Sequence, residues 1–282
     1  MSNFEVLIVS KGHPYDHNAF IAMFEAFEGV TATLVELPAA IAVLAAPSAA
    51  RYDVVFFYDM SGIPGVGLTH DDTDAGGQPS REYAAAINAL LERGTGLMLV
   101  NHATVSWPHW PLWRTISGSP FMLSEGELDG RRVPGSGYRG AHGPLPNATV
   151  QVSPASDHPA IAEIGDGFEI TDELYLKTAD FEASVMPLLR ADYAFVAENF
   201  SPPPLAPAEE QASWSHPPGS NLLAWANAAG NSPVIVSELG DGPATYENPG
   251  YRRFLAASLR WLASDASRAW AREWRQSRTG SR

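Results

Sequence analysis

The sequence predicts an α/β fold: a doubly wound, mostly parallel sheet with helices on both faces. Over the first hundred residues, short apolar runs alternate with amphipathic segments, which is typical of parallel strands joined by crossover helices. The segment 53–57 contains Val-Val-Phe-Phe, as expected for a strand buried on both faces. A helical pattern begins after Ser80, a favourable N-cap, and ends before Gly94.

The remaining elements follow from the same patterns. Phe20, Met23, Phe24 and Phe27 recur at helical spacing after a cap at Asp16 or Asn18. An alanine-rich helix is expected after the second strand, and a long helix from Pro249. The predicted strands are 4–10, 31–37, 53–57, 96–100, 222–228 and 233–239. Residues 118–149 have many Gly and Pro and predict loops with short strands. We expect one domain over 1–264, followed by an Arg-rich helix end over 265–282.

Composition excludes several classes of protein. The 282 residues include 18 basic and 32 acidic side chains, a net charge of −14, which opposes binding to nucleic acid or to anionic membranes. No partner of either kind is expected. The absence of cysteine excludes disulfides, thiolate zinc sites and a cysteine nucleophile.

The basic residues concentrate at the C-terminus. Five arginines and one acid lie in 268–282, which leaves 13 basic and 31 acidic residues before them. Such a tail is typical of a solvated helix end that complements the helix dipole; the alternative is a subunit contact in a homo-oligomer. The chain starts directly with an apolar strand and shows no targeting segment, so we expect a cytoplasmic protein.

Polar side chains follow several of the predicted strands. In open parallel sheets, ligands bind outside the carboxyl ends of the strands. The residues at these positions are His13, His17, Tyr58, Asp59, Asn101, His102, Glu238 and Asp241. We therefore expect a polar pocket at this rim; the alternative is the ordinary polarity of surface loops.

The strongest local signal is the segment 96–113, where a strand turns sharply at Asn101-His102. An imidazole at such a turn suits a general base, a hydrogen-bond donor or a metal ligand. Trp107, Trp110 and Trp113 follow at a spacing of three, which would place them on one side of a helix. They are either core residues or a platform on which a sugar ring stacks.

Two further motifs contain candidate residues. In Asp172-Glu-Leu-Tyr175 the adjacent acids cannot both point to one site, but Glu173 and Tyr175 share a side of an extended chain. The alternative is a solvated acidic turn. His158-Pro159 marks a helix start, where the imidazole either caps the helix or contributes to the site.

Common cofactor motifs are absent or lack their context. Gly135–Gly140 matches G-x-G-x-x-G, but Pro134 precedes it and no helix follows, so no dinucleotide site is expected. No two histidines have a local ligand spacing, so a divalent metal would need a long-range assembly. No cofactor is predicted with certainty. For a metal, the candidate ligands are His17, His102, His158 and Glu173.

Three motifs occur together along the chain. They are the strand-one loop ending in His17, Gly96-Leu-Met-Leu-Val-Asn-His-Ala with its Trp-Pro-His-Trp continuation, and Glu238-Leu-Gly-Asp-Gly-Pro-Ala-Thr-Tyr-Glu-Asn-Pro-Gly-Tyr-Arg-Arg-Phe. Together they resemble the trehalose-utilisation (ThuA-like) family, which has a class I glutamine amidotransferase-like fold with flavodoxin-like layering. The resemblance covers residues 4 to about 264. His158-Pro159 and Asp172-Glu-Leu-Tyr175 match as well.

The resemblance implies a small-molecule carbohydrate substrate and an enzyme acting on keto-sugars or glycosides. His102, Glu173 and His17 are then the acid–base candidates. The candidate substrate-binding residues are Trp107, Trp110, Tyr58, Asn101, His158, Tyr175 and Asp241. His102 stands where true amidotransferases have cysteine, which excludes glutamine hydrolysis. The family usually reads Gly-His-Asp/Glu where this chain has Gly240-Asp241-Gly242, so an imidazole is either replaced by a carboxylate or lost from the site.

Three hypotheses follow. In the first, His102 and Glu173, with His17, move a proton on a keto-sugar or glycoside during isomerisation, hydration or elimination. In the second, the protein binds or senses a sugar without turning it over. In the third, it is a metal-dependent hydrolase.

Overall fold

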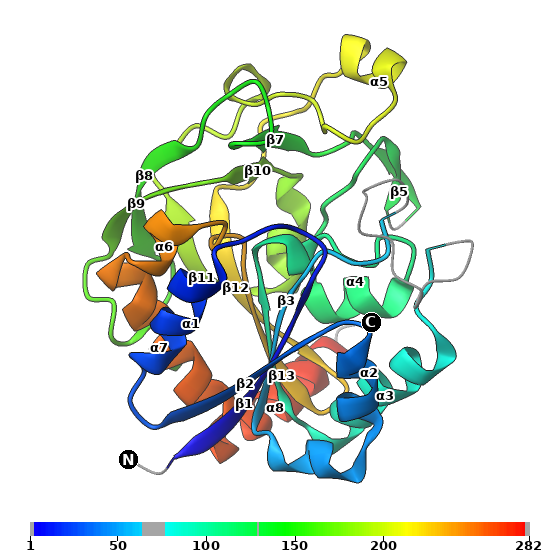
Figure 1. Ribbon diagram of the computed structural model, residues 1–282. Coiled ribbons are helices and arrows are strands. Elements are labelled where there is room, and N and C mark those ends of the chain that lie inside the picture. Colours follow the sequence, from blue (N-terminus) through cyan, green and yellow to red (C-terminus); the bar gives the residue numbers. More distant parts are fainter. Residues whose placement is uncertain (1–2, 64–76, 129, 280–282) are drawn as a thin grey trace.

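The protein is built around one nine-stranded sheet (Figure 1). The structure, a computed structural model, describes residues 3–63, 77–128 and 130–279. The strand order is β2-β1-β3-β4-β13-β12-β11-β8-β9. The strands are β1 (Phe4–Lys11), β2 (Val30–Glu36), β3 (Val54–Asp59), β4 (Gly96–Val100), β8 (Ala148–Pro154), β9 (Phe168–Asp172), β11 (Met186–Ala191), β12 (Leu222–Ala229) and β13 (Ser232–Ser237).

The sheet has a parallel half and an antiparallel half. Strands β2, β1, β3, β4 and β13 run parallel to their neighbours. From β13 onward, β12, β11, β8 and β9 pair antiparallel. The two late strands predicted to be adjacent form the β12–β13 hairpin. The antiparallel extension is longer than expected, because β8 and β11 lie in segments that were not predicted as strands.

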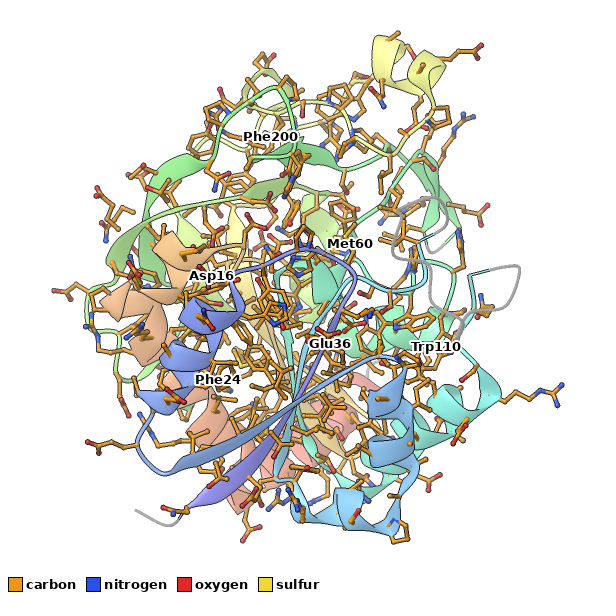
Figure 2. The ribbon with its side chains drawn as sticks, viewed as in Figure 1. Asp16, Phe24, Glu36, Met60, Trp110 and Phe200 are labelled. Carbon is orange, nitrogen blue, oxygen red and sulfur yellow. The ribbon has the colours of Figure 1, made fainter. Side chains whose placement is uncertain are left out.

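Helices cover both faces of the sheet, as predicted (Figure 1). On one face lie α1 (His17–Glu25), α6 (Pro243–Tyr246) and α7 (Pro249–Leu262); on the other lie α2 (Ala39–Ala45), α3 (Arg81–Arg93) and α4 (Pro111–Ser117). Within β1, Val6 and Ile8 pack into the first core while Leu7 and Val9 pack into the second. Phe24 and Trp110 mark these two sides in Figure 2.

Local signals define the helix ends. The Asp16 carboxylate accepts a hydrogen bond from the backbone N–H of Ala19 at 2.9 Å and starts α1. Ser80 caps α3 in the same way through the N–H of Tyr83 at 3.1 Å. Gly94 ends α3 with φ of 79°, a left-handed conformation that glycine adopts without a Cβ clash.

The Arg-rich C-terminal segment forms a helix of its own. Helix α8 (Asp265–Thr279) packs against β12, β13 and α7. Ser267 and Ala271 on this helix are fully buried. The segment is therefore part of the folded domain, whereas the sequence predicted the exposed end of the preceding helix. None of the helices within the described residues is long and apolar enough to span a membrane.

Within the described residues, two small sheets and the short helix α5 (Ala208–Ser213) lie outside the central sheet and the helices that cover it. Strand β7 (Gly137–Arg139) pairs with β10 (Leu174–Leu176), and β5 (Gly126–Leu128) pairs with β6 (Arg131–Val133). Helix α5 protrudes at the top of Figure 1. The β7–β10 sheet lies above the carboxyl ends of the central strands in that view, which brings its side chains toward the expected pocket.

Candidate functional site

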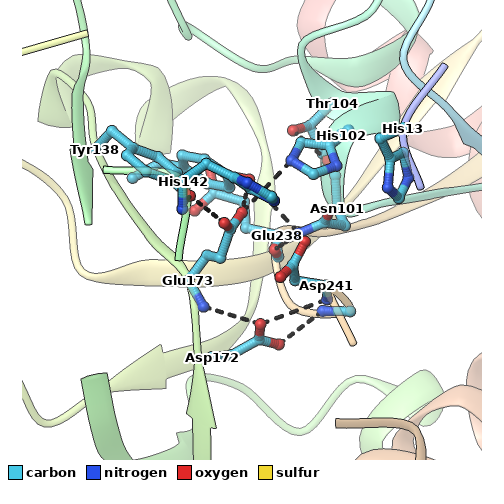
Figure 3. A network of polar contacts seen from close by, with 12 residues as sticks. His13, Asn101, His102, Thr104, Tyr138, His142, Asp172, Glu173, Glu238 and Asp241 are labelled. Atoms are coloured by element: carbon cyan, nitrogen blue, oxygen red, sulfur yellow. Dashed lines mark hydrogen bonds and ion pairs between the residues drawn. The ribbon is translucent and has the colours of Figure 1, made fainter. Parts of the chain in front are cut away.

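The carboxyl ends of four neighbouring strands meet at one rim. Strands β1, β3, β4 and β13 are consecutive in the sheet, so the loops that follow them are adjacent in space. His13 follows β1, His102 follows β4, and Asp241 follows β13 (Figure 3). One ligand atom from each of these three residues lies within 4.8 Å of the other two. The expected polar cluster therefore exists at this rim.

His102 is presented by a strained turn directly after β4. Asn101 has φ of 51°, a left-handed conformation uncommon outside glycine, and a 3₁₀ turn over Asn101–Thr104 follows. This turn buries the imidazole and brings its Nε2 within 3.5 Å of Oε2 of Glu173. Among the described residues, none hydrogen-bonds to Nδ1 of His102. Glu173 is thus the partner that orients the ring.

Glu173 is fully buried yet held in its ionised form. Burial opposes ionisation, but hydrogen bonds from His102, Tyr138 and Tyr175 outweigh it and lower the pKa of Glu173 below its usual value. The Tyr175 hydroxyl donates to Oε2 at 2.8 Å, and the Tyr138 hydroxyl donates to Oε1. Burial and the nearby carboxylate raise the pKa of both tyrosines, so they remain donors at neutral pH. The solvated-turn interpretation of this segment is wrong.

His13 lies beside His102 as a neutral imidazole. The two rings meet edge to face with centroids 4.4 Å apart. Burial, followed by the positive charge that His102 can take up, lowers the pKa of His13 to about 3. Two imidazolium ions at this separation would repel each other. The low pKa of His13 therefore keeps its own imidazole neutral at physiological pH.

Asp241 is held close to the cluster by a second buried acid. The Asp172 carboxylate accepts hydrogen bonds from the backbone N–H of Gly240 and the hydroxyl of Thr245, both at 2.8 Å. Burial, followed by the negative charge of Glu173, raises the pKa of Asp241. Asp241, which stands where the family usually has a histidine, thus places a carboxylate in the site. Asp241 and Glu173 have pKa values displaced in opposite directions, a pattern that separates acid from base roles.

A cavity of about 290 Å³ opens beside these residues. Its wall includes His13, His102, Tyr138, His142 and Tyr175, which come from four separate parts of the chain. The volume is just below the roughly 300–1,000 Å³ typical of small-molecule sites. The cavity therefore suits one compact ligand.

The same residues fit a divalent metal. His13, His102 and Asp241 offer ligand atoms within 4.8 Å of one another, and His142, Glu173 and Asp241 form a second such group. Nε2 of His13 is buried and has no hydrogen-bond partner among the described residues. Two neutral imidazoles with a carboxylate are a donor set that suits zinc or iron. The sequence named His102 and Glu173 among the ligands but not His13, His142 or Asp241.

Two of the predicted site residues lie elsewhere. His17 is exposed at the start of α1 and stacks on Tyr15 with ring centroids 4.1 Å apart. His158 caps a short 3₁₀ helix by accepting a hydrogen bond from the N–H of Ala160. It packs edge to face on Trp261, 4.5 Å between centroids. Each of these two histidines lies at the start of a helix. Neither lines the cavity or belongs to the two ligand groups.

The predicted aromatic platform is also absent from the cavity. Trp107 is fully buried beside Tyr83, and Trp110 packs partly buried against the same core. Helix α4 begins at Pro111, so the tryptophans do not share one helix face. They are core residues, which is one of the two alternatives that the sequence left open.

Tyr58 and Asn101 support the site from behind and do not line the cavity. The Tyr58 hydroxyl donates to the carbonyl of Gly240 at 2.7 Å. Asn101 donates through Nδ2 to the carbonyl of Glu238 at 3.2 Å. These contacts fix the loop after β13. Of the predicted substrate-binding residues, Tyr175 lines the cavity and Asp241 belongs to the adjoining cluster.

Sequence reasoning missed Tyr138 and His142. Both lie in the Gly-rich segment predicted as loops, and β7 places Tyr138 opposite Tyr175 in the small sheet. The backbone N–H of His142 then donates to the Tyr138 hydroxyl at 3.2 Å. The sequence signal that could have marked them as site residues is the occurrence of a tyrosine and a histidine in a glycine-rich segment. Their position depends on the pairing of Tyr138 with Tyr175, 37 residues further along the chain, which no local pattern reveals.

A second, larger cleft of about 600 Å³ lies away from this cluster. Arg114, Arg131 and Asp180 are in its wall, and Arg131 pairs with Asp180 at 2.6 Å. None of the His102–Glu173 cluster residues lines it. The smaller cavity is therefore the candidate active site, because it contains the groups that can move a proton.

Comparison with known proteins agrees with this architecture. Residues 5–262 match the family described as trehalose utilisation, ThuA. The chain belongs to this family. No curated protein matches it.

Solved structures of ThuA-like proteins share the fold. One from Parabacteroides merdae is 15% identical, with 93% of this chain and 91% of that chain covered and a TM-score of 0.60. Another from Bacteroides uniformis is 16% identical, with 94% and 93% covered and a TM-score of 0.58. A further solved structure, of a Salmonella typhimurium protein described only as cytoplasmic, is 13% identical, with 91% and 98% covered and a TM-score of 0.52. At these identities the likeness establishes the fold of this ThuA family member, and the site chemistry rests on its own residues.

Proposed function

We propose that this ThuA family protein is a carbohydrate-processing enzyme that moves a proton on a keto-sugar or glycoside. The observation that carries the proposal is the buried contact between His102 and Glu173 at the wall of a compact cavity. Family membership connects the protein to trehalose utilisation, and the dyad supplies an acid–base pair.

Each group in the cluster has a distinct role in this proposal. His102 accepts a proton from a carbon next to the substrate carbonyl and becomes an imidazolium. The ionised Glu173 stabilises that cation, and His13 remains neutral beside it. Asp241, whose pKa is raised, supplies a proton to the departing or re-forming oxygen. His17 has no part in this scheme because it lies outside the cavity wall.

The test is turnover of a panel of keto-glucosides in D₂O, followed by NMR at the carbon next to the carbonyl. His102→Ala and Glu173→Gln should each reduce exchange and turnover by at least about 100-fold, the lower end of what general acid–base catalysis contributes. His109→Ala, an exposed histidine outside the cavity, is the matched control. Melting temperatures verify folding. Full activity in His102→Ala contradicts the assignment.

A second candidate is metal-dependent hydrolysis, favoured by the His13, His102 and Asp241 group. A bound divalent metal would activate water and polarise a carbonyl. In that case metal analysis of the purified protein would find an ion, chelator would abolish activity, and His13→Ala would lose the ion. Turnover that survives chelation supports the acid–base proposal instead. Sugar binding without turnover of any substrate would favour a regulatory protein.

We also propose a cytoplasmic location. The support is the likeness to the Salmonella typhimurium protein described as cytoplasmic, together with the absence of cysteine.

A further inference from the structure

We propose that the outer part of the catalytic cavity binds an apolar group of the substrate. This inference rests on the proposed function. It names the preferred substrate class as keto-glycosides with an aromatic or alkyl aglycone, in preference to those in which the sugar is joined to a second sugar.

The cavity is lined by two chemically different sets of side chains. Its hydrogen-bonding side chains are three histidines and two tyrosines, all near the His102–Glu173 contact. The other described residues of the wall are apolar, apart from one glycine. The apolar members are Pro14, Met60, Val105, Phe121, Leu123, Pro203, Pro204 and Leu205. A ligand that fills the cavity thus meets polar groups on one part of the wall and apolar groups over the remainder.

Leu205 is unusual in its exposure. It is 46% exposed, and Ile21 at 42% is the other large apolar side chain exposed to this degree among the described residues. Ile21 lies on α1 and does not line the cavity, whereas Leu205 does. Covering an exposed leucine with an apolar group removes apolar surface from water and favours binding.

The loop that carries Leu205 is held in place before any ligand binds. The N–H of Ala206 donates to the carbonyl of Pro203 at 3.1 Å, which closes a turn around Leu205. The Gln211 side chain donates to the carbonyl of Ala206 at 2.8 Å. Adjacent prolines at 203 and 204 restrict the backbone further. A preorganised loop loses little conformational entropy on binding, which favours affinity.

A second sugar ring would find few partners on this apolar part of the wall. Each buried hydroxyl without a hydrogen bond costs free energy. Among the residues that the structure describes, no arginine, lysine, aspartate, glutamate or amide side chain lines the cavity. The hydroxyls of Tyr138 and Tyr175 already donate to Glu173. An apolar aglycone carries no such requirement, so it suits this surface better.

The experiment measures binding and turnover separately. Calorimetry with phenyl β-glucoside, methyl β-glucoside and trehalose tests the apolar wall without requiring chemistry. We expect the phenyl glycoside to bind most tightly. Leu205→Gln should reduce the preference for phenyl over methyl by roughly tenfold, the scale of a small apolar contact in a pocket. Ile21→Gln, the exposed apolar residue outside the cavity, should leave the preference unchanged.

The same variants are then assayed with the corresponding keto-glycosides, where kcat/KM should follow the same order. Equal or tighter binding of trehalose, or an unchanged preference in Leu205→Gln, would overturn the inference. If phenyl binding depends on Leu205 but no keto-glycoside is turned over, the apolar site stands and the proposed enzymatic function fails.

Discussion

Asp241 shows how one residue can change a site without removing it. The family pattern implied a histidine here, and the sequence left open whether the group was lost. The structure keeps Asp241 within 4.8 Å of ligand atoms on His13 and His102. A carboxylate in place of an imidazole adds negative charge beside Glu173, which contributes to the raised pKa of Asp241. The substitution therefore converts a basic position into a potential proton donor.

His13 gives a pH-dependent prediction at the residue scale. Its pKa is lowered to about 3 in the folded state, whereas in the unfolded chain it takes up a proton near pH 6.5. The unfolded state thus binds more protons between these values, and stability must fall as pH decreases through this window. For one proton, the free energy of unfolding can change by at most about 1.4 kcal/mol per pH unit.

We therefore expect the free energy of unfolding of His13→Gln to fall less than that of the wild type as the pH is lowered from 6.5 to 4. Urea unfolding at several pH values in this range measures the difference. His109→Gln, at an exposed position, serves as the control. Identical pH dependence in His13→Gln and the wild type would show that His13 is not held neutral by the fold.

At the element scale, the segment from the end of β9 through β10 organises the site. Asp172 holds the loop after β13, Glu173 contacts His102, and Tyr175 holds Glu173. The N–H of Glu173 also donates to the Asp172 carboxylate at 2.8 Å. Asp172 and Tyr175, which flank Glu173 in this short segment, thus fix the positions of the Glu173 and Asp241 carboxylates relative to each other.

Asp172→Asn tests this coupling. The amide places an N–H₂ group where the carboxylate accepts hydrogen bonds, so at least one of the buried donors on Gly240, Thr245 or Glu173 loses its partner. We expect a loss of about 1–3 kcal/mol in the free energy of unfolding. We also expect reduced kcat/KM and an altered pH profile, since Asp241 is displaced. Glu169→Gln, exposed on β9, is the control for both measurements. Wild-type stability and activity would refute the coupling.

At the scale of the whole molecule, buried charge and the C-terminal helix join parts of the fold that are distant in sequence. Lys177 is fully buried and bonds Glu238 at 2.7 Å and the carbonyl of Leu222 at 2.8 Å. It thereby connects the end of β10 to the β12–β13 hairpin. On α8, Arg278 donates to the carbonyl of Ala183 at 2.8 Å. Part of the basic tail thus makes contacts within its own chain. A contact with another subunit stays a prediction.

Removing Lys177 should destabilise the protein strongly. Lys177→Met leaves Glu238 buried without its counter-charge, which costs about 3–5 kcal/mol in comparable buried pairs. The double variant Lys177→Met with Glu238→Gln should recover part of this loss, because no unpaired charge is left. Chemical denaturation of the single and double variants measures the effect. A double variant no more stable than Lys177→Met would contradict the charge argument.

The sequence by itself determined the elements whose signals are local. β4 occupies Gly96–Val100 as predicted, α3 runs from its Ser80 cap to Gly94, and α7 begins at Pro249. Periodicity, caps and glycine conformation act within a few residues and can be read directly. Local patterns also singled out His102 and Glu173 as candidates, because each follows or flanks a recognisable strand, and their catalytic roles stay a prediction.

Only the tertiary structure decided which polar residues meet. His13, Tyr138 and Asp241 join His102 and Glu173, whereas His17 and His158 remain at helix starts. The tryptophans became core, and β8, β11 and the β7–β10 sheet extended the fold beyond the predicted strands. These outcomes depend on pairings between segments tens of residues apart. Their free energy comes from burial and strand pairing that no local pattern encodes, and those contacts decide which surface becomes the cavity.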